Sequence, residues 1–429
     1  MYQQSRKRHC YQSQSGDRFS TGDSCIFIAL LLRTVEVFDG VIPQNFGRLA
    51  TAKSRLLYEK LDEQLVSGND EPPLVLLTWT KFFGAPCCTP DPIRSSCSQL
   101  SCIVTDNRSM HREAAAVIFH WGASDVLRAT GHWRDFNASD LPPHRTARQR
   151  YIFFMLESPL ATKPPVTRAP NHFFNWTMTY RRDSDIFMPY RVSSELKKAQ
   201  DYYAKKTRLA LWAVSNCRTS SRREQLVHQL QLQPGVSIDV IGRCGNKTIC
   251  PRGKKDAESC LGRLLNEQYA FYIAFENAVC IDYITEKFWR RRLHYAIPVV
   301  LSREIYENVA PPKSFIAADD FDAVGEMAEH LKRVWHNRSE YLSYFHWRRM
   351  GYNRSFGQDE QGRLLGYCRL CQRLQEERDK LGASTSKSYS HEQLANWWYK
   401  RGNCQTLQRK IFRRFHPPAT TSRKNQFTH

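Results

Sequence analysis

The segment Phe271-Tyr-Ile-Ala-Phe-Glu-Asn277 is followed closely by Asp282-Tyr-Ile-Thr-Glu-Lys287 and then by Ile297-Pro-Val-Val-Leu301. The first and third segments are apolar runs typical of buried strands, and the second is polar and then amphipathic. This order predicts strand, loop, helix and strand, a unit of parallel α/β sheets that presents a helix N-terminus to an anion such as phosphate. We therefore expect the chemistry to lie in the loop.

The same alternation extends over most of the 429 residues. Apolar residues have helical spacing in Ser194–Lys205, Ser220–Leu232 and Asp322–Trp335. Other short apolar runs are Leu74–Trp79, Ala115–Phe119, Tyr151–Met155, Leu209–Val214 and Ser237–Ile241. Strands that alternate with helices indicate parallel α/β sheets. Pro159–Tyr203 is rich in proline, arginine and aromatic residues, and we expect it to separate two such sheets.

Further motifs along the chain, together with the opening segments, resemble the α-1,3-fucosyltransferases, inverting enzymes that use GDP-fucose. They are Leu156–Pro159, Phe174–Thr177, Asp183–Phe187, Ser215–Cys217, Pro312–Ile316, Asp319–Phe321, Tyr341–Phe345 and the pair Cys368 and Cys371. The motifs follow the order of the family and span roughly three quarters of the chain. The resemblance implies an α/β protein with the GT-B fold, in which two Rossmann-like domains face each other across a cleft.

The resemblance and the composition together predict four regions. Residues 1–70 would form a tail with a weak anchor and a stem, and residues 71–205 an acceptor-binding Rossmann-like domain. Residues 206–372 would form a GDP-fucose-binding Rossmann-like domain, and residues 373–429 a basic C-terminal extension.

The formal net charge of +21 suggests an anionic partner. Nucleic acid, an acidic membrane surface and a nucleotide-linked donor all fit, and simple solubility is the alternative explanation. Part of the excess lies in Arg290–Arg292 and in the C-terminal tail. Because the sequence shows neither zinc-finger spacing nor a basic and aromatic single-strand-binding pattern, we expect no nucleic-acid partner.

Cysteine content and glycosylation motifs point to the secretory pathway. Fourteen cysteines are typical of disulfides in a lumenal enzyme rather than of a reduced cytosolic chain. Random placement would give about two Asn-X-Ser/Thr motifs, whereas this sequence has six. They begin at Asn107, Asn137, Asn175, Asn246, Asn337 and Asn353. The motif at Asn175 lies within one of the family motifs, so its role is either structural or a glycan site.

The family resemblance implies a Golgi membrane protein with a lumenal catalytic domain and one N-terminal membrane helix. Here Arg6-Lys-Arg8 precedes the apolar run Cys25–Leu32, but Arg33 and Glu36 end that run after eight residues. A membrane span requires about 20. The sequence therefore predicts only a weak anchor segment.

Fucosyl transfer from GDP needs a positive site for the departing diphosphate. Lys287 is predicted in the first turn of a helix that starts near Asp282, where its ammonium and the helix N–H groups can converge on one phosphate. A solvated lysine is the alternative. By resemblance, Glu286 binds the ribose hydroxyls, and Tyr283 and Asn277 complete the nucleotide pocket.

A second cation is expected where Ser215-Asn-Cys217 ends a strand and a helix opens. Arg223 matches the phosphate-binding arginine of the family by its distance from that motif, and Arg222 is its close competitor. A guanidinium suits two phosphate oxygens at once. Either arginine could instead be an exposed helix residue.

Glu157 is the candidate general base. It follows the apolar run Tyr151–Met155, so it should lie at the carboxyl end of a strand, where α/β proteins bind ligands. By resemblance, the glutamate of this Glu-Ser-Pro motif removes the acceptor proton in a single displacement with inversion. A turn-capping role is the alternative.

No metal and no other cofactor is expected to be essential. Asp183 and Asp185 could chelate a metal ion, but GT-B enzymes use lysine and arginine in its place, and a structural role is favoured. Cys368 and Cys371 lack a second Cys-X2-Cys or a histidine pair, as a zinc site would need. In the family such cysteines bridge to the N-terminal domain, and the candidates here are Cys97 and Cys102, with Cys87 and Cys88 as competitors.

The ending Leu394–Cys404, with Trp397 and Trp398, resembles members that fucosylate the innermost GlcNAc of N-glycans. Exposed tryptophans would stack on sugar rings, whereas buried ones would attach the tail to the catalytic domains. We therefore predict α-1,3-fucosyl transfer to the N-glycan core of glycoproteins. The alternatives are a Lewis-type enzyme acting on N-acetyllactosamine, and a non-catalytic basic protein that binds glycans or nucleic acid.

Overall fold

The computed structural model describes residues 72–82, 101–122, 141–162, 165–190, 202–245, 249–250, 254–349, 362–379 and 387–404, together with residues 406, 409 and 415. The predicted tail, anchor and stem, residues 1–70, lie outside this part of the chain. Within the described part, no helix combines the length and the apolar character that crossing a membrane requires.

The first sheet has the strand order β2-β1-β3-β4-β5-β6, and all its strand pairs are parallel. Its strands are β1 (Leu74–Thr78), β2 (Cys102–Thr105), β3 (Ala114–His120), β4 (Arg150–Met155), β5 (Trp176–Thr179) and β6 (Ile186–Phe187). Every residue of β4 and β5 is buried, as expected for central parallel strands that are covered on both faces.

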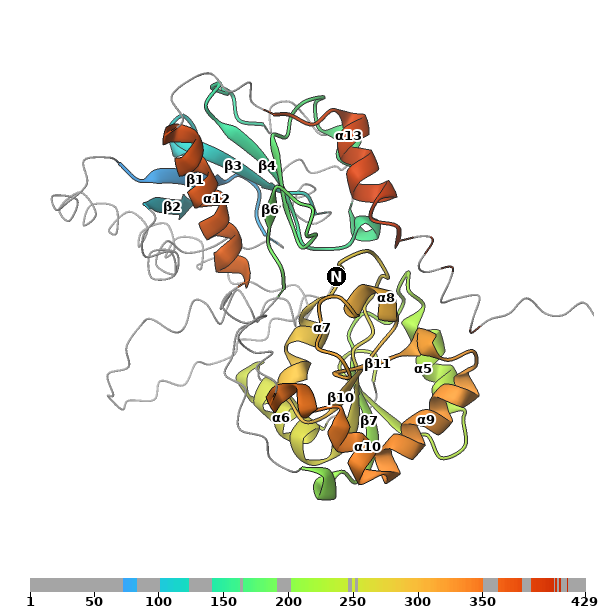
Figure 1. The fold of residues 1–429 in the computed structure, drawn as a ribbon. Coiled ribbons are helices and arrows are strands. Elements are labelled where there is room, and N and C mark those ends of the chain that lie inside the picture. Colours follow the sequence, from blue (N-terminus) through green and yellow to red (C-terminus); the bar gives the residue numbers. More distant parts are fainter. Residues whose placement is uncertain are drawn as a thin grey trace, which may run out of the picture.

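The second sheet has the order β11-β10-β9-β7-β8, again with parallel pairs only. Its strands are β7 (Arg208–Ala213), β8 (Ile238–Ile241), β9 (Tyr269–Ile273), β10 (Ile297–Val300) and β11 (Ile316–Ala317). The helices between and after them are α5 (Arg223–Gln231), α6 (Lys254–Glu267), α7 (Glu286–Trp289), α8 (Arg303–Tyr306), α9 (Val324–His336) and α10 (Arg338–Ser343). Two parallel sheets, each in its own domain, confirm the predicted α/β class and the two Rossmann-like domains of GT-B (Figure 1).

Short 3-10 helices connect these elements. They are η1 (Arg108–His111), η3 (Pro159–Ala161), η4 (Val166–Arg168), η5 (Tyr203–Lys205), η6 (Arg291–Leu293), η7 (Ala318–Asp320) and η8 (His346–Arg349). Most of the predicted helix Ser194–Lys205 lies outside the described residues, and its last three residues form η5. The predicted helices Ser220–Leu232 and Asp322–Trp335 correspond to α5 and α9.

The chain returns to the first domain after the second sheet is complete. Helix α12 (Gly362–Asp379) contacts β1 and β6, and Figure 1 shows it beside the first sheet together with α13 (His391–Ala395). The Arg150 guanidinium donates to Glu377 over 2.8 Å, and a disulfide joins Cys102 to Cys371. The predicted boundary after residue 372 therefore falls inside α12, a helix whose contacts are with the first sheet.

The basic run Arg290–Arg292 is partly structural. Arg291 is buried, and its guanidinium donates to both carboxylate oxygens of Glu258 on α6, over 2.7 and 2.9 Å. A bidentate pair of this kind fixes two elements relative to each other, and the carboxylate neutralises the charge of the arginine. Arg291 therefore does not contribute a surface charge for an anionic partner.

Candidate active site

The candidate site lies where three loops follow the carboxyl ends of parallel strands. Glu157 comes after β4 of the first sheet, the loop 215–222 after β7, and the loop 274–285 after β9. Parallel α/β sheets bind ligands at this end of their strands. The geometry therefore brings the predicted base and the predicted donor residues to related positions in two domains.

Helix α7 begins later than predicted. The expected start was near Asp282, but this residue has φ of 60°, in the left-handed region, and α7 begins at Glu286. The Thr285 side chain caps the helix by accepting from the Lys287 N–H. Lys287 still lies in the first turn, as predicted, although the helix is only four residues long.

A buried carboxylate organises this first turn. Glu276 is 4% exposed and accepts hydrogen bonds from the Thr285 backbone N–H at 2.7 Å and from the Thr285 hydroxyl at 2.8 Å. The Lys287 ammonium lies 3.3 Å from Glu276 and 3.3 Å from Glu286. The lysine is thus held between two carboxylates, with 24% of its side chain exposed.

Electrostatics keep Lys287 charged. Burial alone would lower the pKa of Lys287, but Glu276 and Glu286 outweigh it and raise that pKa above its ordinary value. Arg223 acts in the opposite direction on the pKa of Lys287, which is the effect of a second cation close by. Burial raises the pKa of Glu276, although Lys287 opposes this. The site therefore contains an ammonium group that is charged at neutral pH, with restricted access to solvent.

Glu276 was not assigned a role from the sequence, although it belongs to the opening segment. Glu276 is a charged residue at the end of an otherwise apolar run. A charge in such a run is expected to be buried beside an opposite charge, and this pattern could have indicated its role. Next to it, the Asn277 carbonyl accepts from the Ser221 N–H and the Ser220 hydroxyl, both at 3.1 Å. The buried Asn277 Oδ1 has no hydrogen-bond partner among the described residues. This oxygen is therefore available to accept a hydrogen bond from a ligand.

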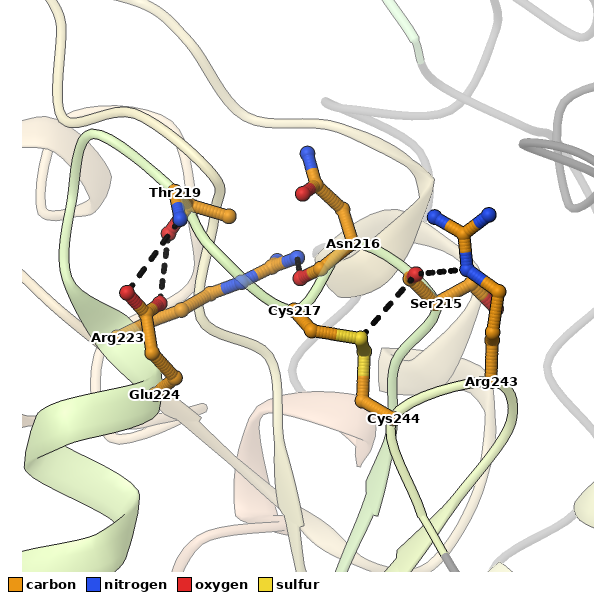
Figure 2. Close-up of a disulfide and its surroundings, with 8 residues drawn as sticks. All are labelled: Ser215, Asn216, Cys217, Thr219, Arg223, Glu224, Arg243 and Cys244. Carbon is orange, nitrogen blue, oxygen red and sulfur yellow. Dashed lines mark hydrogen bonds between the residues drawn. A yellow bond between two sulfur atoms is a disulfide. The ribbon is translucent and has the colours of Figure 1, made fainter.

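Arg223 is the first residue of α5 and is 3% exposed, whereas Arg222 is exposed and has φ of 52°. The Arg223 guanidinium donates to the Phe275 carbonyl over 2.7 Å and to the Asn216 carbonyl over 3.1 Å. Figure 2 shows the side chain reaching across to Asn216, beside the Cys217–Cys244 disulfide. These contacts tie the loop after β7 to the loop after β9, and they favour Arg223 over Arg222 as the buried cation.

Glu157 reaches the second domain through Tyr283. The Tyr283 hydroxyl donates to Glu157 Oε2 over 2.8 Å, and the Tyr283 side chain is 1% exposed. Burial, and then Glu157, raise the pKa of Tyr283 well above its ordinary value, so the phenol stays protonated and can donate. Tyr283, predicted in the nucleotide pocket, is thus placed against the predicted base.

A cavity of ≈ 10 Å³ lies beneath the loop, and its lining includes Glu276, Tyr283 and Tyr306. This is about the room that one water molecule occupies. The buried Tyr306 hydroxyl has no hydrogen-bond partner among the described residues. Tyr306 was not singled out from the sequence, where nothing distinguishes it from other aromatic core residues.

The two aspartates Asp183 and Asp185 have separate partners. Asp183 accepts two hydrogen bonds from Arg181, over 2.9 and 2.7 Å. Asp185 accepts from the Thr177 N–H and from the hydroxyl of Tyr389, and the Lys387 ammonium lies 2.8 Å away. Asp183 also pairs with Arg401, at 3.1 Å, so both carboxylates connect the first domain to the C-terminal part of the chain, in agreement with the structural role that the sequence favoured. Among the described residues, no group of three or more His, Cys, Asp or Glu could hold a metal ion.

Cys371 forms a disulfide with Cys102, which is one of the two candidate partners in the N-terminal domain. Cys368 is also disulfide-bonded, while Cys97, Cys87 and Cys88 lie outside the described residues. Three further bridges were not predicted: Cys217–Cys244, Cys250–Cys260 and Cys280–Cys404. Pairings of this kind do not follow from spacing alone.

The two tryptophans of the C-terminal ending are buried. Trp397 and Trp398 are 6% and 0% exposed in the π-helix η9 (Asn396–Lys400), and the Trp398 indole donates to the Thr162 hydroxyl over 2.8 Å. Of the two possibilities that the sequence left open, the burial favours attachment of the ending to the first domain over exposed side chains that stack on sugar rings.

The sequence matches two family descriptions over most of its length. Residues 71–191 match "Fucosyltransferase, N-terminal", and residues 203–397 match "Glycosyltransferase family 10 (fucosyltransferase) C-term". The chain belongs to the fucosyltransferase family. The prediction of an enzyme from this family is confirmed, and nothing in the matches supports a non-catalytic binding protein.

Curated relatives cover this fucosyltransferase well. Alpha-(1,3)-fucosyltransferase fut-5 of Caenorhabditis elegans is 34% identical over 78% of this chain and 84% of the relative. The human 4-galactosyl-N-acetylglucosaminide 3-alpha-L-fucosyltransferase FUT5 is 36% identical over 71% of this chain and 77% of the relative. Among solved structures, a crystal structure of alpha1,3-fucosyltransferase with GDP-fucose shares 14% identity over 81% of this chain and 93% of that chain, with a TM-score of 0.41. The site described above does not depend on this last, distant likeness.

Proposed function

We propose that this fucosyltransferase transfers L-fucose from GDP-fucose to the 3-hydroxyl of a GlcNAc residue, with inversion. One contact carries the proposal. The Glu157 carboxylate of the first domain accepts a hydrogen bond from Tyr283 of the second domain. Tyr283 lies in the same loop as Glu276, which pairs with Lys287. A candidate base and a candidate leaving-group cation therefore belong to one continuous site.

The second domain would take up the negative charge that develops on the departing GDP. The Lys287 ammonium stays charged between Glu276 and Glu286 and remains partly exposed, so it can reach a diphosphate oxygen. Arg223 adds a second positive charge nearby, and Glu286 is assigned to the ribose hydroxyls. Charged donors that are already in place stabilise a developing anion without reorganisation of solvent.

The first domain would activate the acceptor. Glu157 takes the proton of the sugar hydroxyl while the hydroxyl oxygen forms a bond to C1 of fucose and the bond from C1 to the diphosphate breaks. Attack from the face opposite to the leaving group gives inversion. Tyr283 orients the Glu157 carboxylate by its hydrogen bond. Tyr283 and Asn277 are also proposed to contact the nucleotide.

The N-glycan core is the proposed acceptor, because the ending with Trp397, Trp398 and Cys404 resembles enzymes that act there. The two indoles are buried, so they are not themselves part of the proposed sugar-binding surface. A second candidate is galactosylated GlcNAc, which the name of the human relative specifies for that protein. The two acceptors differ in the groups that surround the same hydroxyl.

We also propose that catalysis needs no metal ion and takes place in the Golgi lumen on a membrane-attached enzyme. Lysine and arginine in the donor site support the first part, because they can neutralise a diphosphate themselves. The disulfides Cys102–Cys371, Cys217–Cys244, Cys250–Cys260 and Cys280–Cys404 support the second, because such bridges persist in oxidising compartments.

Incubation with labelled GDP-fucose tests the proposal. We expect label to appear in an α-1,3 linkage on an N-glycopeptide acceptor, and less of it on free N-acetyllactosamine. The reverse preference would make the protein a Lewis-type enzyme and leave the donor site unchanged. Absence of transfer to both acceptors by folded protein would contradict the proposed function.

A further inference from the structure

The loop 274–285 after β9, here called the donor loop, contains four consecutive residues, Cys280–Tyr283, that each contact a segment outside the domain of the second sheet. Cys280 forms a disulfide with Cys404, and the Ile281 N–H donates to the Gly402 carbonyl over 3.0 Å. Asp282 pairs with Arg182, and Tyr283 donates to Glu157 over 2.8 Å. We infer that this linking segment, residues 280–283, positions the base Glu157 relative to the donor site, and that Arg182 and Asp282 are positioning residues of the reaction.

The contact partners of the first two residues lie against the turn that carries Glu157. A side chain at Gly402 would approach the Trp398 carbonyl to 2.5 Å and Pro159 Cγ to 3.0 Å, so the backbone at residue 402 packs tightly on the first domain. Pro159 is two residues after Glu157. The disulfide and the Ile281 hydrogen bond therefore fix the donor loop to the same short turn that presents the base.

Asp282 supplies the charged part of the link. Its φ of 60° is tolerated by aspartate more readily than by most residues. The carboxylate accepts from the Arg182 N–H over 3.0 Å and from Arg182 Nε over 2.9 Å. The Asp282 side chain is 10% exposed and that of Arg182 is 53% exposed. The pair is thus half-buried and accessible to substitution without disturbing a core.

The linking segment leads directly to the groups proposed for catalysis. Tyr283 follows Asp282, Thr285 accepts the Lys287 N–H, and both threonine donors bind Glu276. A shift of the segment would therefore move Tyr283 away from Glu157 before it affected the cation held by Glu276. This inference rests on the proposed function, since it assigns Glu157 as the base.

Substitution of Arg182 by alanine tests the inference, because it removes the Nε bond and the charge but leaves the backbone N–H. We expect kcat to fall about 10-fold, within the 10²-fold that a misplacement of about 1 Å costs, while affinity for GDP stays within twofold. Arg333→Ala is the matched control. It removes an exposed arginine that pairs with Glu340 inside one domain, at 3.1 Å, and should leave kcat unchanged.

A double-mutant comparison separates positioning from a general structural role. In a Glu157→Gln background no base remains to be positioned, so Arg182→Ala should cost less than twofold there. An equal 10-fold loss in both backgrounds, or no loss in the wild-type background, would overturn the inference.

Hydrogen exchange of the peptide covering residues 280–285 provides a readout without turnover. Arg182→Ala should speed exchange there, and unchanged exchange would also overturn the inference. If wild-type protein fails to use GDP-fucose, the proposed function fails, whereas this exchange measurement still tests the linking segment.

A separate observation concerns the glycosylation motifs. Asn175 is 1% exposed and uses both ends of its amide: Oδ1 accepts from the Tyr151 N–H over 2.7 Å and from Arg145 over 2.5 Å, and Nδ2 donates to the Lys387 carbonyl over 2.9 Å. The third residue of its motif, Thr177, is also fully buried. A glycan would replace one of the two hydrogens on Nδ2, and the burial of Asn175 leaves no room for the sugar in this fold.

Asn107 and Asn337 differ from Asn175 in both respects. Both are exposed, and the bonds described at their side chains go to Oδ1, from the Ser109 N–H at 3.2 Å and from the Glu340 N–H at 3.0 Å. Glycosylation modifies Nδ2 and leaves Oδ1 able to accept. We propose that Asn107 and Asn337 carry N-glycans and that Asn175 is a structural residue. Asn137, Asn246 and Asn353 lie outside the described residues.

Secretion of the full chain behind a heterologous leader in a glycosylating host tests this second inference independently of the native location. Release of glycans from its peptides by peptide-N-glycosidase A, which also cleaves glycans with α-1,3-fucose on the core, in heavy-oxygen water should convert Asn107 and Asn337, but not Asn175, to labelled aspartate. A label at Asn175 in folded, secreted protein would overturn the assignment, as would unmodified Asn107 and Asn337.

Discussion

The donor loop and the C-terminal ending meet at the candidate site but are held in place by different forces. In the loop, Glu276 and Lys287 form a mostly buried ion pair that is completed by Thr285. In the ending, Trp398 is fully buried and packs edge-on against Phe153, with 5.4 Å between the ring centroids. The nearby Cys280–Cys404 disulfide also holds the ending in place. Charge is concentrated in one region, and apolar packing with a covalent bond in the other.

The difference follows from what each region must do. Burying charges is costly, so Glu276 and Lys287 are retained side by side where the proposed ligand changes charge during the reaction. The C-terminal ending only has to stay in place, and aromatic burial with a disulfide does most of this, with Arg181 stacked on the Trp397 ring. Substitutions in the loop should therefore alter turnover in a folded protein, whereas substitutions in the ending should alter stability.

The largest effect on turnover is expected at Glu157. Glu157→Gln keeps the size of the side chain but removes the base, so kcat should fall about 10²–10⁴-fold. Thermal unfolding should be unchanged, since the residue is only partly buried. Initial rates with GDP-fucose and an acceptor measure the effect. Activity close to that of wild type would return Glu157 to a turn-capping role.

Lys287→Ala should lower kcat by about 10²–10³-fold, because one preorganised positive donor to the leaving group is lost. The variant leaves Glu276 buried without its cation, so Lys287→Arg is a useful partner that keeps the charge and should retain more activity. Rates of both variants in the presence of EDTA should match those without it. A fall in wild-type activity on metal removal would contradict the assignment of the charge to Lys287 and Arg223.

In the ending, Trp398→Ala should reduce the free energy of unfolding by about 3–5 kcal/mol through loss of a fully buried indole and the cavity it leaves. Leu232, which is 68% exposed, provides the control, and Leu232→Ala should have little effect. Denaturant unfolding measures both. A Trp398→Ala protein of normal stability that had lost acceptor affinity would instead restore the role in sugar binding.

A smaller effect is expected from pH at His294. Burial, then Arg291, lower the pKa of His294 to about 4. The pKa of His294 in the folded protein lies below its ordinary value of 6.5. The contribution of neutral His294 to stability is therefore fully present above pH 6.5 and is lost as the pH falls toward 4. The loss attributable to this residue is at most about 3 kcal/mol. Unfolding of His294→Gln should be less sensitive to acid over this interval, and the exposed His228→Gln should behave like wild type.

Much of the fold was predictable because apolar runs and helical spacing are local signals. The runs at Leu209–Val214 and Ser237–Ile241 became β7 and β8. Short strands such as β6, with two residues, carry too little pattern to be found. The return of α12 to the first sheet depends on contacts of Cys371 and Glu377 with residues more than 200 positions away, which no local pattern contains.

The candidate site was predictable as a set of residues but not as a geometry. Family motifs located Glu157, Arg223 and Lys287, yet they gave no indication that Tyr283 would bridge to Glu157 from the other domain. The helix start near Asp282 was missed because a left-handed residue interrupts the pattern, and Thr285 is the actual cap. Burial of Trp397 depends on Arg181, which stacks on its ring at 4.7 Å and is distant in sequence.

We propose that the base and the leaving-group cation come from different domains of one site. Titration of GDP into Glu157→Gln and Lys287→Ala, in parallel with their turnover, tests it most directly. We predict that Glu157→Gln binds GDP with wild-type affinity while losing turnover, and that Lys287→Ala loses both. An equal loss of GDP affinity in Glu157→Gln, or wild-type GDP affinity and turnover in Lys287→Ala, would contradict this division of roles.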